Sequence, residues 1–163
     1  MDQVKVFAPA TIANVACGFD VLGLALDYPG DEVLIKKTDS KQIIITACHN
    51  AENLPLEADK NVAGVAVKAL LDKLGSDQGF EIELTKGVKP GSGIGSSAAS
   101  SAAAVIAVNH LLGEPFTRKE LVEFAMQGEK CATGVAHADN VAPSICGGFT
   151  LVRSYEPLDV IKI

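Results

Sequence analysis

The sequence of 163 residues contains no tryptophan, and aromatic residues make up only 5% of it. Aromatic side chains are a common platform on which proteins stack the bases of single-stranded nucleic acid, so their scarcity argues against that class of function. The net charge of −6 points the same way, because nucleic-acid-binding proteins usually present a basic face. Binding of any polyanion would need local help from backbone amides, a lysine or a metal ion.

Paired cysteines, a leader segment and long apolar runs are missing as well. The four cysteines form no Cys-x-x-Cys pair, and no histidine stands at a zinc-finger spacing, a pattern typical of reduced thiols in the cytoplasm. The first residues lack the basic and apolar regions of a signal peptide. The longest apolar run, residues 98–108, is interrupted by serines and is too short to span a bilayer. We expect a cytoplasmic protein with no membrane or nucleic-acid partner.

Length and composition indicate a single globular domain. Apolar residues make up 48% of the chain and charged residues 21%, a balance that is usual for such domains. Short apolar or alternating stretches predict strands at residues 4–8, 32–37, 42–47, 80–84 and 149–152, and residues 21–26 form a further apolar segment. Loops are expected at residues 11–20 and 133–143, a turn at 28–31 and a hairpin turn at 39–41.

Three helices are expected between and after these strands. The first starts at Asp59 or Asn61 and ends at Leu74, before Gly75, and the second spans about residues 97–112. The third follows Thr117, which fits a capping box with Glu120 ahead of the apolar run 121–126. Strands that precede and interleave with helices predict an α+β layered domain.

A glycine-rich loop is the most informative segment of the chain. It reads Pro90, Gly91, Ser92, Gly93, Ile94, Gly95, Ser96, Ser97, and an alanine-rich run follows. Glycines permit tight turns and leave backbone amides bare, and consecutive bare amides form a concave site for an anion. The helix that follows adds the positive end of its dipole. The loop therefore predicts a phosphate site, most naturally for a nucleotide.

Three other kinds of loop share some of these features. A P-loop requires Lys followed by Ser or Thr after its last glycine, and no lysine follows Gly95. The dinucleotide-binding fingerprint requires Gly-x-Gly-x-x-Gly directly after a strand, but here the last glycine comes one place early. A tight strand-to-helix connection without a ligand is the plainest alternative. The double serine favours a ligand, because one hydroxyl can cap the helix while the other contacts Mg²⁺ or a phosphate.

The loop resembles the signature Pro-x-Gly-x-Gly-Leu-Gly-Ser-Ser-Ala of the GHMP superfamily of small-molecule kinases. Gly91, Gly93, Gly95, Ser96, Ser97 and Ala98 match its fixed positions, Ile94 replaces the leucine, and Pro90 stands one place nearer the first glycine than the signature's proline. Two further segments are similar to motifs of the homoserine kinase family. One is residues 9–14 with residues 18–23, and the other is residues 137–143 with the glycine pair 147–148. These three motifs follow one another between residues 9 and 148, so the resemblance extends along nearly the whole chain.

The resemblance implies a ribosomal protein S5 domain 2-like α+β fold for residues 1–163, the N-terminal ATP-binding domain of such kinases. It also implies a C-terminal ferredoxin-like domain that is absent from this chain, together with a third glycine-rich motif. Neither Arg118 in a helix cap nor Arg153 in a terminal strand is convincing as a carboxylate-binding residue, and the resemblance implies that the family's carboxylate-binding arginines belong to that second half. The isolated chain is therefore expected to be inactive, and a homodimer stays open.

The resemblance further implies ATP and Mg²⁺ as cofactors and homoserine as the phosphoryl acceptor, a step of threonine biosynthesis. The glycine loop, with Asn61, would bind the nucleotide, and Ser97 and Glu129 would hold Mg²⁺. Residues implied in substrate binding are Asn14, Asp20, His137 and Asp139. Asn140 occupies the place where several relatives carry a catalytic aspartate. Asparagine cannot act as a base, so Asn140 is expected to orient the acceptor hydroxyl.

Each of these residues has a plainer structural reading. Asn61 could simply cap a helix, and Asn14 and Asp20 are common turn residues. Glu129 could be an exposed acid beside Lys130. The alternatives for the function are a related GHMP kinase of shikimate or mevalonate type and a non-catalytic nucleotide-binding fragment.

Overall fold

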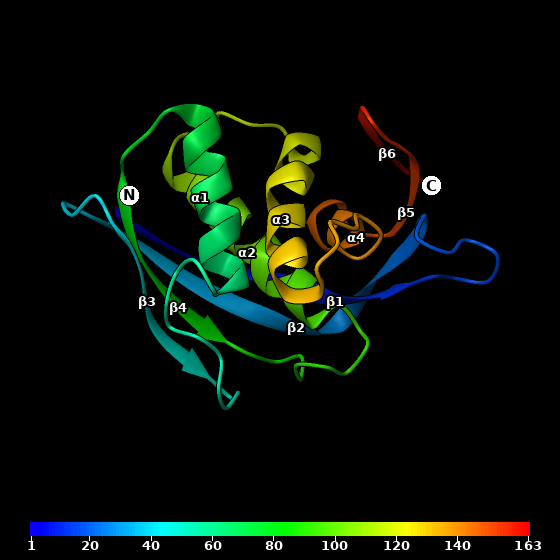
Figure 1. The fold of residues 1–163 in the computed structure, drawn as a ribbon, viewed down its shortest axis with the longest axis horizontal. Helices are drawn as coiled ribbons and strands as arrows, with labels where there is room; N and C mark the ends of the chain where they lie inside the picture. The colour runs from blue at the N-terminus through cyan, green and yellow to red at the C-terminus, as the bar shows by residue number, and fades with distance from the viewer.

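The computed structural model describes all residues, 1–163, as a mixed sheet with its helices on one side (Figure 1). The six strands are β1 (Gln3–Ala13), β2 (Leu22–Thr38), β3 (Ile43–His49), β4 (Gly79–Thr85), β5 (Phe149–Tyr155) and β6 (Leu158–Lys162). The helices are α1 (Val62–Leu74), α2 (Ser96–Leu111), α3 (Arg118–Thr133) and α4 (Val141–Cys146). The expected α+β layered class is confirmed. None of the helices is long and apolar enough to cross a membrane.

The long strand β2 is the backbone of the sheet, whose order is β3-β4-β2-β5-β6, with β1 also paired to β2. Its first residues pair with β5, and its second half pairs with β4. β1 runs antiparallel to β2 along almost its whole length. Since β2 connects both halves of the sheet, residues far apart in the sequence meet along it.

Two expectations about this part of the chain are wrong. The residues expected as a turn at 28–31 lie inside β2, and residues 11–13, expected in a loop, lie in β1. Both differences occur where the β1–β2 register shifts, between Pro9 and Thr11. Gly30 fits there because a Cβ atom would collide with the backbone of Ala8 and the ring of Phe7. The turn-forming residues thus bend a continuous strand instead of ending it.

The expected hairpin between residues 32–37 and 42–47 is also wrong. β3 does not pair with β2 but runs parallel to β4, which lies between the two. The insertion of a strand from later in the chain leaves no local signal, because residues 39–41 satisfy the turn rules in either topology. The sequence also missed β6, and the expected loop 133–143 ends inside α4.

The helix α2 is buried on nearly every side and packs against β1, β2, α1 and α3. A helix without a polar face belongs at the centre of a domain, and alanines and serines at most of its positions allow neighbouring elements to approach closely. α1 begins at the expected cap, where Asn61 Oδ1 accepts the Ala63 N–H at 3.0 Å, and Gly75 ends it at φ +69°. The capping box of Thr117 and Glu120 at the start of α3 is confirmed.

Candidate functional site

The glycine-rich loop connects β4 to the buried helix α2, and its backbone has the shape that the sequence predicts. Gly91, Gly93 and Gly95 all have positive φ, at +76°, +79° and +67°, a region that side chains rarely allow. No atom lies within 4 Å of the position that a Cβ would take at Gly91 or Gly93, so both face open space. The loop therefore offers bare backbone at the N-terminus of α2, as an anion site requires.

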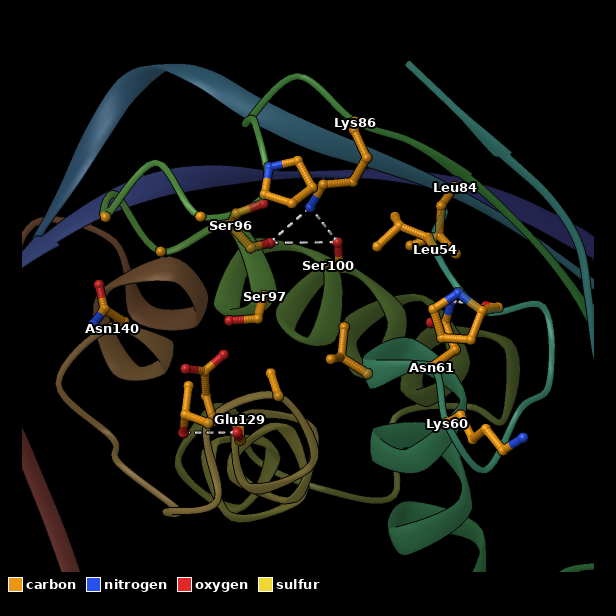
Figure 2. Close-up of a pocket in the computed structure, with 18 residues that line it drawn as sticks. Leu54, Lys60, Asn61, Leu84, Lys86, Ser96, Ser97, Ser100, Glu129 and Asn140 are labelled. Atoms are coloured by element: carbon orange, nitrogen blue, oxygen red, sulfur yellow. Dashed lines mark hydrogen bonds between the residues drawn. The ribbon is translucent and has the colours of Figure 1, made fainter. Parts of the chain in front are cut away.

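A cavity of about 410 Å³ lies beside this loop (Figure 2). It is bounded by the glycine loop, the start of α1, the start of α2, the C-terminal end of α3 and the residue before α4. Of the residues expected to bind nucleotide or metal, those that line it are Asn61, Pro90, Gly91, Gly93, Gly95, Ser96, Ser97 and Glu129. Ser92 and Ile94 belong to the loop but not to the cavity wall. Most of the expected phosphate site is thus one continuous surface.

The hydroxyl of Ser96 is used inside the protein, because it donates to the Val88 carbonyl at 2.8 Å. Gly95, not a serine, is the N-cap of α2, and no side chain caps that helix. The expectation that one of the two serines caps α2 is therefore wrong. Ser97 points into the cavity, toward α3 (Figure 2). Of the two serines, Ser96 holds the loop in place and Ser97 faces the cavity.

Asn61 also has both ends of its side-chain amide occupied within the protein. Its oxygen caps α1, and its nitrogen donates to the Pro55 carbonyl at 2.8 Å. It lines the cavity as a fixed wall. The structure therefore gives Asn61 a clear structural role, whatever it contributes to a ligand.

Glu129 reaches the cavity from α3 and faces Ser97 of α2 (Figure 2). The residue is only 7% exposed, and its Oε1 has no hydrogen-bond partner. Burial raises the pKa of this carboxyl above its ordinary value, and the nearby Ser97 hydroxyl partly offsets that rise. A buried carboxylate oxygen without a partner is costly, so the position calls for a ligand of positive charge.

The oxygens of Glu129 and Ser97 fit a Mg²⁺ ion that the protein would coordinate together with a bound phosphate. The chain contains no group of three or more His, Cys, Asp or Glu side chains that could hold a metal by themselves. Mg²⁺ takes one or two protein oxygens and completes its shell with water and phosphate oxygens. One carboxylate and one hydroxyl beside a loop of bare backbone amides match this mode of coordination.

Under the glycine loop lies a buried network that sequence reasoning missed. The Lys86 ammonium contacts Asp31 and donates to the Ser96 carbonyl and the Ser100 hydroxyl, both at 2.8 Å (Figure 2). Asp31 in turn accepts the backbone N–H groups of Gly87 and Val88. Both charged side chains are almost fully buried, and burial lowers the pKa of Lys86. The network ties β2 and the end of β4 to the start of α2.

No local signal could have identified this network. Asp31 stood in an expected turn, and Lys86 stood in a polar segment next to the loop, 55 residues away. Only the pairing of β2 with β4 brings them together. All three N–H bonds of Lys86 have partners, so its side chain is a support for the loop.

The expected substrate-binding residues Asn14, Asp20 and His137 gather at a second position, near the start of α4. Asn14 Oδ1 accepts the backbone N–H of Asp20 at 2.7 Å, and His137 Nδ1 lies 3.5 Å from Asp20 Oδ1. The Tyr155 hydroxyl donates to the Asp20 carbonyl at 2.7 Å. Sequence reasoning missed Tyr155 because its role depends on a contact across 135 residues.

The two candidate carboxylates of this cluster differ in access to solvent. Asp139 is only 2% exposed, its Oδ1 accepts the N–H of Asn140 at 3.0 Å, and burial raises its pKa. The side chain of Asp20 is 34% exposed. Asp20 is therefore the better placed of the two to meet a ligand from outside. None of the four expected substrate residues lines the cavity; the connection is Asn140, which follows Asp139 and does line it.

Asn140 precedes α4 and faces the glycine loop across the cavity (Figure 2). Its Oδ1 accepts a hydrogen bond of 2.8 Å from the hydroxyl of Thr11, a residue of β1. The Thr11 N–H donates to the Ile94 carbonyl at 3.1 Å. Asn140 thus lines the cavity and directly follows Asp139 of the second cluster in the chain.

Comparison with known proteins places these observations in a family. The model of the GHMP kinases N-terminal domain matches residues 61–148 of this chain, which include α1, β4, the glycine loop, α2, α3 and α4. Homoserine kinase of Chloroherpeton thalassium is 50% identical over an alignment that covers 100% of this chain and 54% of the relative.

Solved structures give the same result. The crystal structure of homoserine kinase from Cytophaga hutchinsonii matches with a TM-score of 0.95 at 56% identity, over 100% of this chain and 52% of that one. The mevalonate kinase of Methanococcus jannaschii matches with a TM-score of 0.74 at 21% identity, over 99% of this chain and 56% of the other, a likeness of fold alone. The chain spans about half the length of the curated relatives it matches.

Proposed function

Because the chain belongs to the GHMP kinase family, we propose that it is the nucleotide-binding part of an enzyme that phosphorylates the side-chain hydroxyl of L-homoserine with ATP and Mg²⁺. The observation that carries the proposal is the meeting of two features at one cavity. Bare glycine-loop backbone lies at the N-terminus of α2, and the unpartnered carboxylate oxygen of Glu129 lies beside Ser97. The high identity to homoserine kinases over the whole chain supports the choice of acceptor.

The nucleotide would bind along the cavity. The backbone amides of the glycine loop would hold the β- and γ-phosphates, with the positive end of α2 directed at them. The adenine end would lie toward the start of α1, at the wall that Asn61 and Val62 form. Glu129 and Ser97 would hold Mg²⁺, which when bound supplies charge neutralisation on the phosphate oxygens.

The acceptor would approach from the second cluster, past Asn140. Its ammonium group suits the exposed carboxylate of Asp20, and Asn14 and His137 complete the polar surface there, while the buried Asp139 accepts the N–H of Asn140. In the reaction a bond forms between the homoserine oxygen and the γ-phosphorus, and the bond from that phosphorus to the ADP oxygen breaks. The hydroxyl proton leaves to a phosphate oxygen or to solvent. Positioning and charge stabilisation carry most of the catalysis in such transfers.

The proposal includes a second domain. Residues 1–163 would be the N-terminal domain, and further chain would contribute the arginines that bind the acceptor carboxylate. It also includes a cytoplasmic location, a role in threonine synthesis and a homodimer. Size-exclusion chromatography with light scattering on the protein produced from its complete gene tests the dimer.

Substrate profiling tests the activity directly. ADP release is measured with homoserine, threonine, serine, shikimate and mevalonate, using both the 163-residue chain and the protein produced from its complete gene. We expect homoserine-dependent ADP release from the complete protein and little or none from the 163-residue chain. Turnover of mevalonate or shikimate in preference to homoserine would show that the acceptor is misassigned. Absence of ATP turnover with every alcohol would favour a nucleotide-binding role without catalysis.

A further inference from the structure

Thr11 is a fully buried residue of β1 that no part of the reaction scheme uses. Its side chain is 0% exposed, and its hydroxyl has one hydrogen bond, donated to Asn140 Oδ1 at 2.8 Å. The two residues lie 129 positions apart in the sequence. The only partner of this buried hydroxyl is a side chain at the cavity wall, and a buried polar group is retained at a cost unless it is hydrogen-bonded.

The contact is enclosed by the glycine loop. A Cβ atom at Gly95 would collide with the Thr11 hydroxyl and would lie 3.0 Å from Asn140 Oδ1. The Thr11 N–H donates to the carbonyl of Ile94, one residue earlier in the loop. Three segments of the chain therefore converge on one amide oxygen, which is covered by Gly95 on one side and bonded to Thr11 on another.

The other end of the Asn140 amide is free. Its Nδ2 makes no hydrogen bond within the protein, yet it is not among the buried atoms without a partner, so solvent reaches it. Asn140 lines the cavity, and Figure 2 shows its oxygen directed toward the glycine loop and its nitrogen turned away from that loop. A primary amide held in this way offers two N–H donors to whatever binds there and hides its acceptor.

We infer that Thr11 is a positioning residue that fixes the carboxamide of Asn140, so that Asn140 serves the reaction as a hydrogen-bond donor. This inference rests on the proposed function, since the partner of the N–H group is the acceptor hydroxyl oxygen or a transferred phosphoryl oxygen. In either case Asn140 orients an oxygen atom and accepts no proton from it. Gly95 has a second task beside its turn geometry, because any side chain there would displace the Thr11–Asn140 pair.

The kinetic test uses variants of the complete protein. Thr11→Val removes the hydroxyl and keeps the shape, and we expect kcat for homoserine to fall by about 10- to 100-fold with each KM within about twofold of its wild-type value. Thr11→Ser restores the hydroxyl and should restore most of kcat. Thr150→Val is the matched control, because Thr150 is also 0% exposed and donates to a backbone carbonyl, that of Gly23. If Thr11→Val does not fold, Thr11→Ala takes its place.

A double-variant comparison separates positioning from general damage. A residue that acts through Asn140 has nothing left to position once that side chain is removed. Thr11→Val should therefore lower kcat in the wild-type background and change it less than about twofold in an Asn140→Ala background. Equal losses in both backgrounds would overturn the inference, as would a Thr11→Val enzyme with wild-type kcat or a Thr11→Ser enzyme as slow as Thr11→Val.

A spectroscopic readout works even if the protein has no homoserine kinase activity. With ¹⁵N-labelled asparagine, the Asn140 side-chain NH₂ signal is identified by its loss in Asn140→Asp. We expect this signal to shift in Thr11→Val and to return near its original position in Thr11→Ser. An unmoved signal in Thr11→Val would contradict the contact itself. Inactive wild-type protein with a shifted signal would reject the proposed function while leaving the contact intact.

Discussion

Two polar clusters lie against the same cavity, and they differ in how completely their polar groups are hydrogen-bonded within the protein. In the network of Asp31, Lys86 and Ser100, every charged group has hydrogen-bond partners inside the protein. In the pair of Glu129 and Ser97, one carboxylate oxygen has none. A saturated cluster holds its surroundings in place, whereas an unsaturated one is completed by a ligand. The groups with all their hydrogen-bond partners inside the protein therefore form the scaffold of this site, and the group without a partner belongs to its ligand-binding surface.

The largest effect should come from breaking the saturated network. Lys86→Met leaves the Asp31 carboxylate buried without its counter-charge, and we expect a loss of about 3–5 kcal/mol in the free energy of unfolding. Asp31→Asn combined with Lys86→Met removes both charges and keeps an oxygen for the amides of Gly87 and Val88, so it should recover most of the loss. Urea unfolding measures both.

Lys5 supplies the matched control, because its ion pair with Glu32 lies in solvent. Lys5→Met should cost at most about 1 kcal/mol. If Lys86→Met were as harmless as Lys5→Met, the buried network would have no special role in holding the glycine loop.

Replacing the Glu129 carboxylate with a neutral amide should have the opposite effects: stability is kept while activity is lost. Glu129→Gln removes a buried charge that lacks a partner, so the free energy of unfolding should stay the same or rise. Use of Mg-ATP should fall by about 100-fold in kcat/KM, because the cation loses its carboxylate. Glu123→Gln, an exposed position on the same helix, is the control and should change neither quantity. A large loss of stability in Glu129→Gln would place Glu129 with the scaffold.

A smaller effect is expected at Ser97. Ser97→Ala should reduce kcat/KM for Mg-ATP by about tenfold, because Mg²⁺ readily replaces a lost hydroxyl ligand with water. Ser101→Ala removes a fully buried hydroxyl from the same helix, bonded to the Val62 carbonyl at 3.4 Å, and should leave Mg-ATP use almost unchanged. Equal losses in the two variants would remove Ser97 from the metal site.

The smallest effect is a dependence of stability on pH. Burial raises the pKa of Glu129 in the folded protein above the ordinary value of 4.5, so the folded state holds this proton more tightly than the unfolded state. Its contribution is favourable below pH 4.5 and is lost as the pH rises through the raised pKa. The wild type should therefore lose stability relative to Glu129→Gln between pH 4.5 and neutral pH. Parallel stability curves for the two proteins would refute this assignment.

Local features of the molecule could be predicted because neighbouring residues determine them. The glycine loop, the cap of α1 at Asn61 and the capping box of α3 all rest on residues a few positions apart. The three glycines of the loop predict tight turns, and all three have positive φ angles.

Long-range features could not be predicted for the opposite reason. The position of β4 between β2 and β3 is decided by the packing of the whole sheet, and the pairing of Asp31 with Lys86 follows from it. Turn-forming residues at 28–31 argued for a break that the β1–β2 register shift absorbs. The bonds of Thr11 to Asn140 and of Tyr155 to Asp20 likewise join segments more than 120 positions apart.

The central claim is that the unsaturated cluster and the glycine loop form one site for a metal–triphosphate. A crystal of the protein with a non-hydrolysable ATP analogue and Mn²⁺ tests it most directly, because Mn²⁺ is visible by its anomalous scattering. We expect the triphosphate along Gly91–Ser97 and the Mn²⁺ peak between Glu129 Oε1 and the Ser97 hydroxyl. A triphosphate bound elsewhere, with Glu129 Oε1 still unpartnered beside an empty glycine loop, would contradict the account.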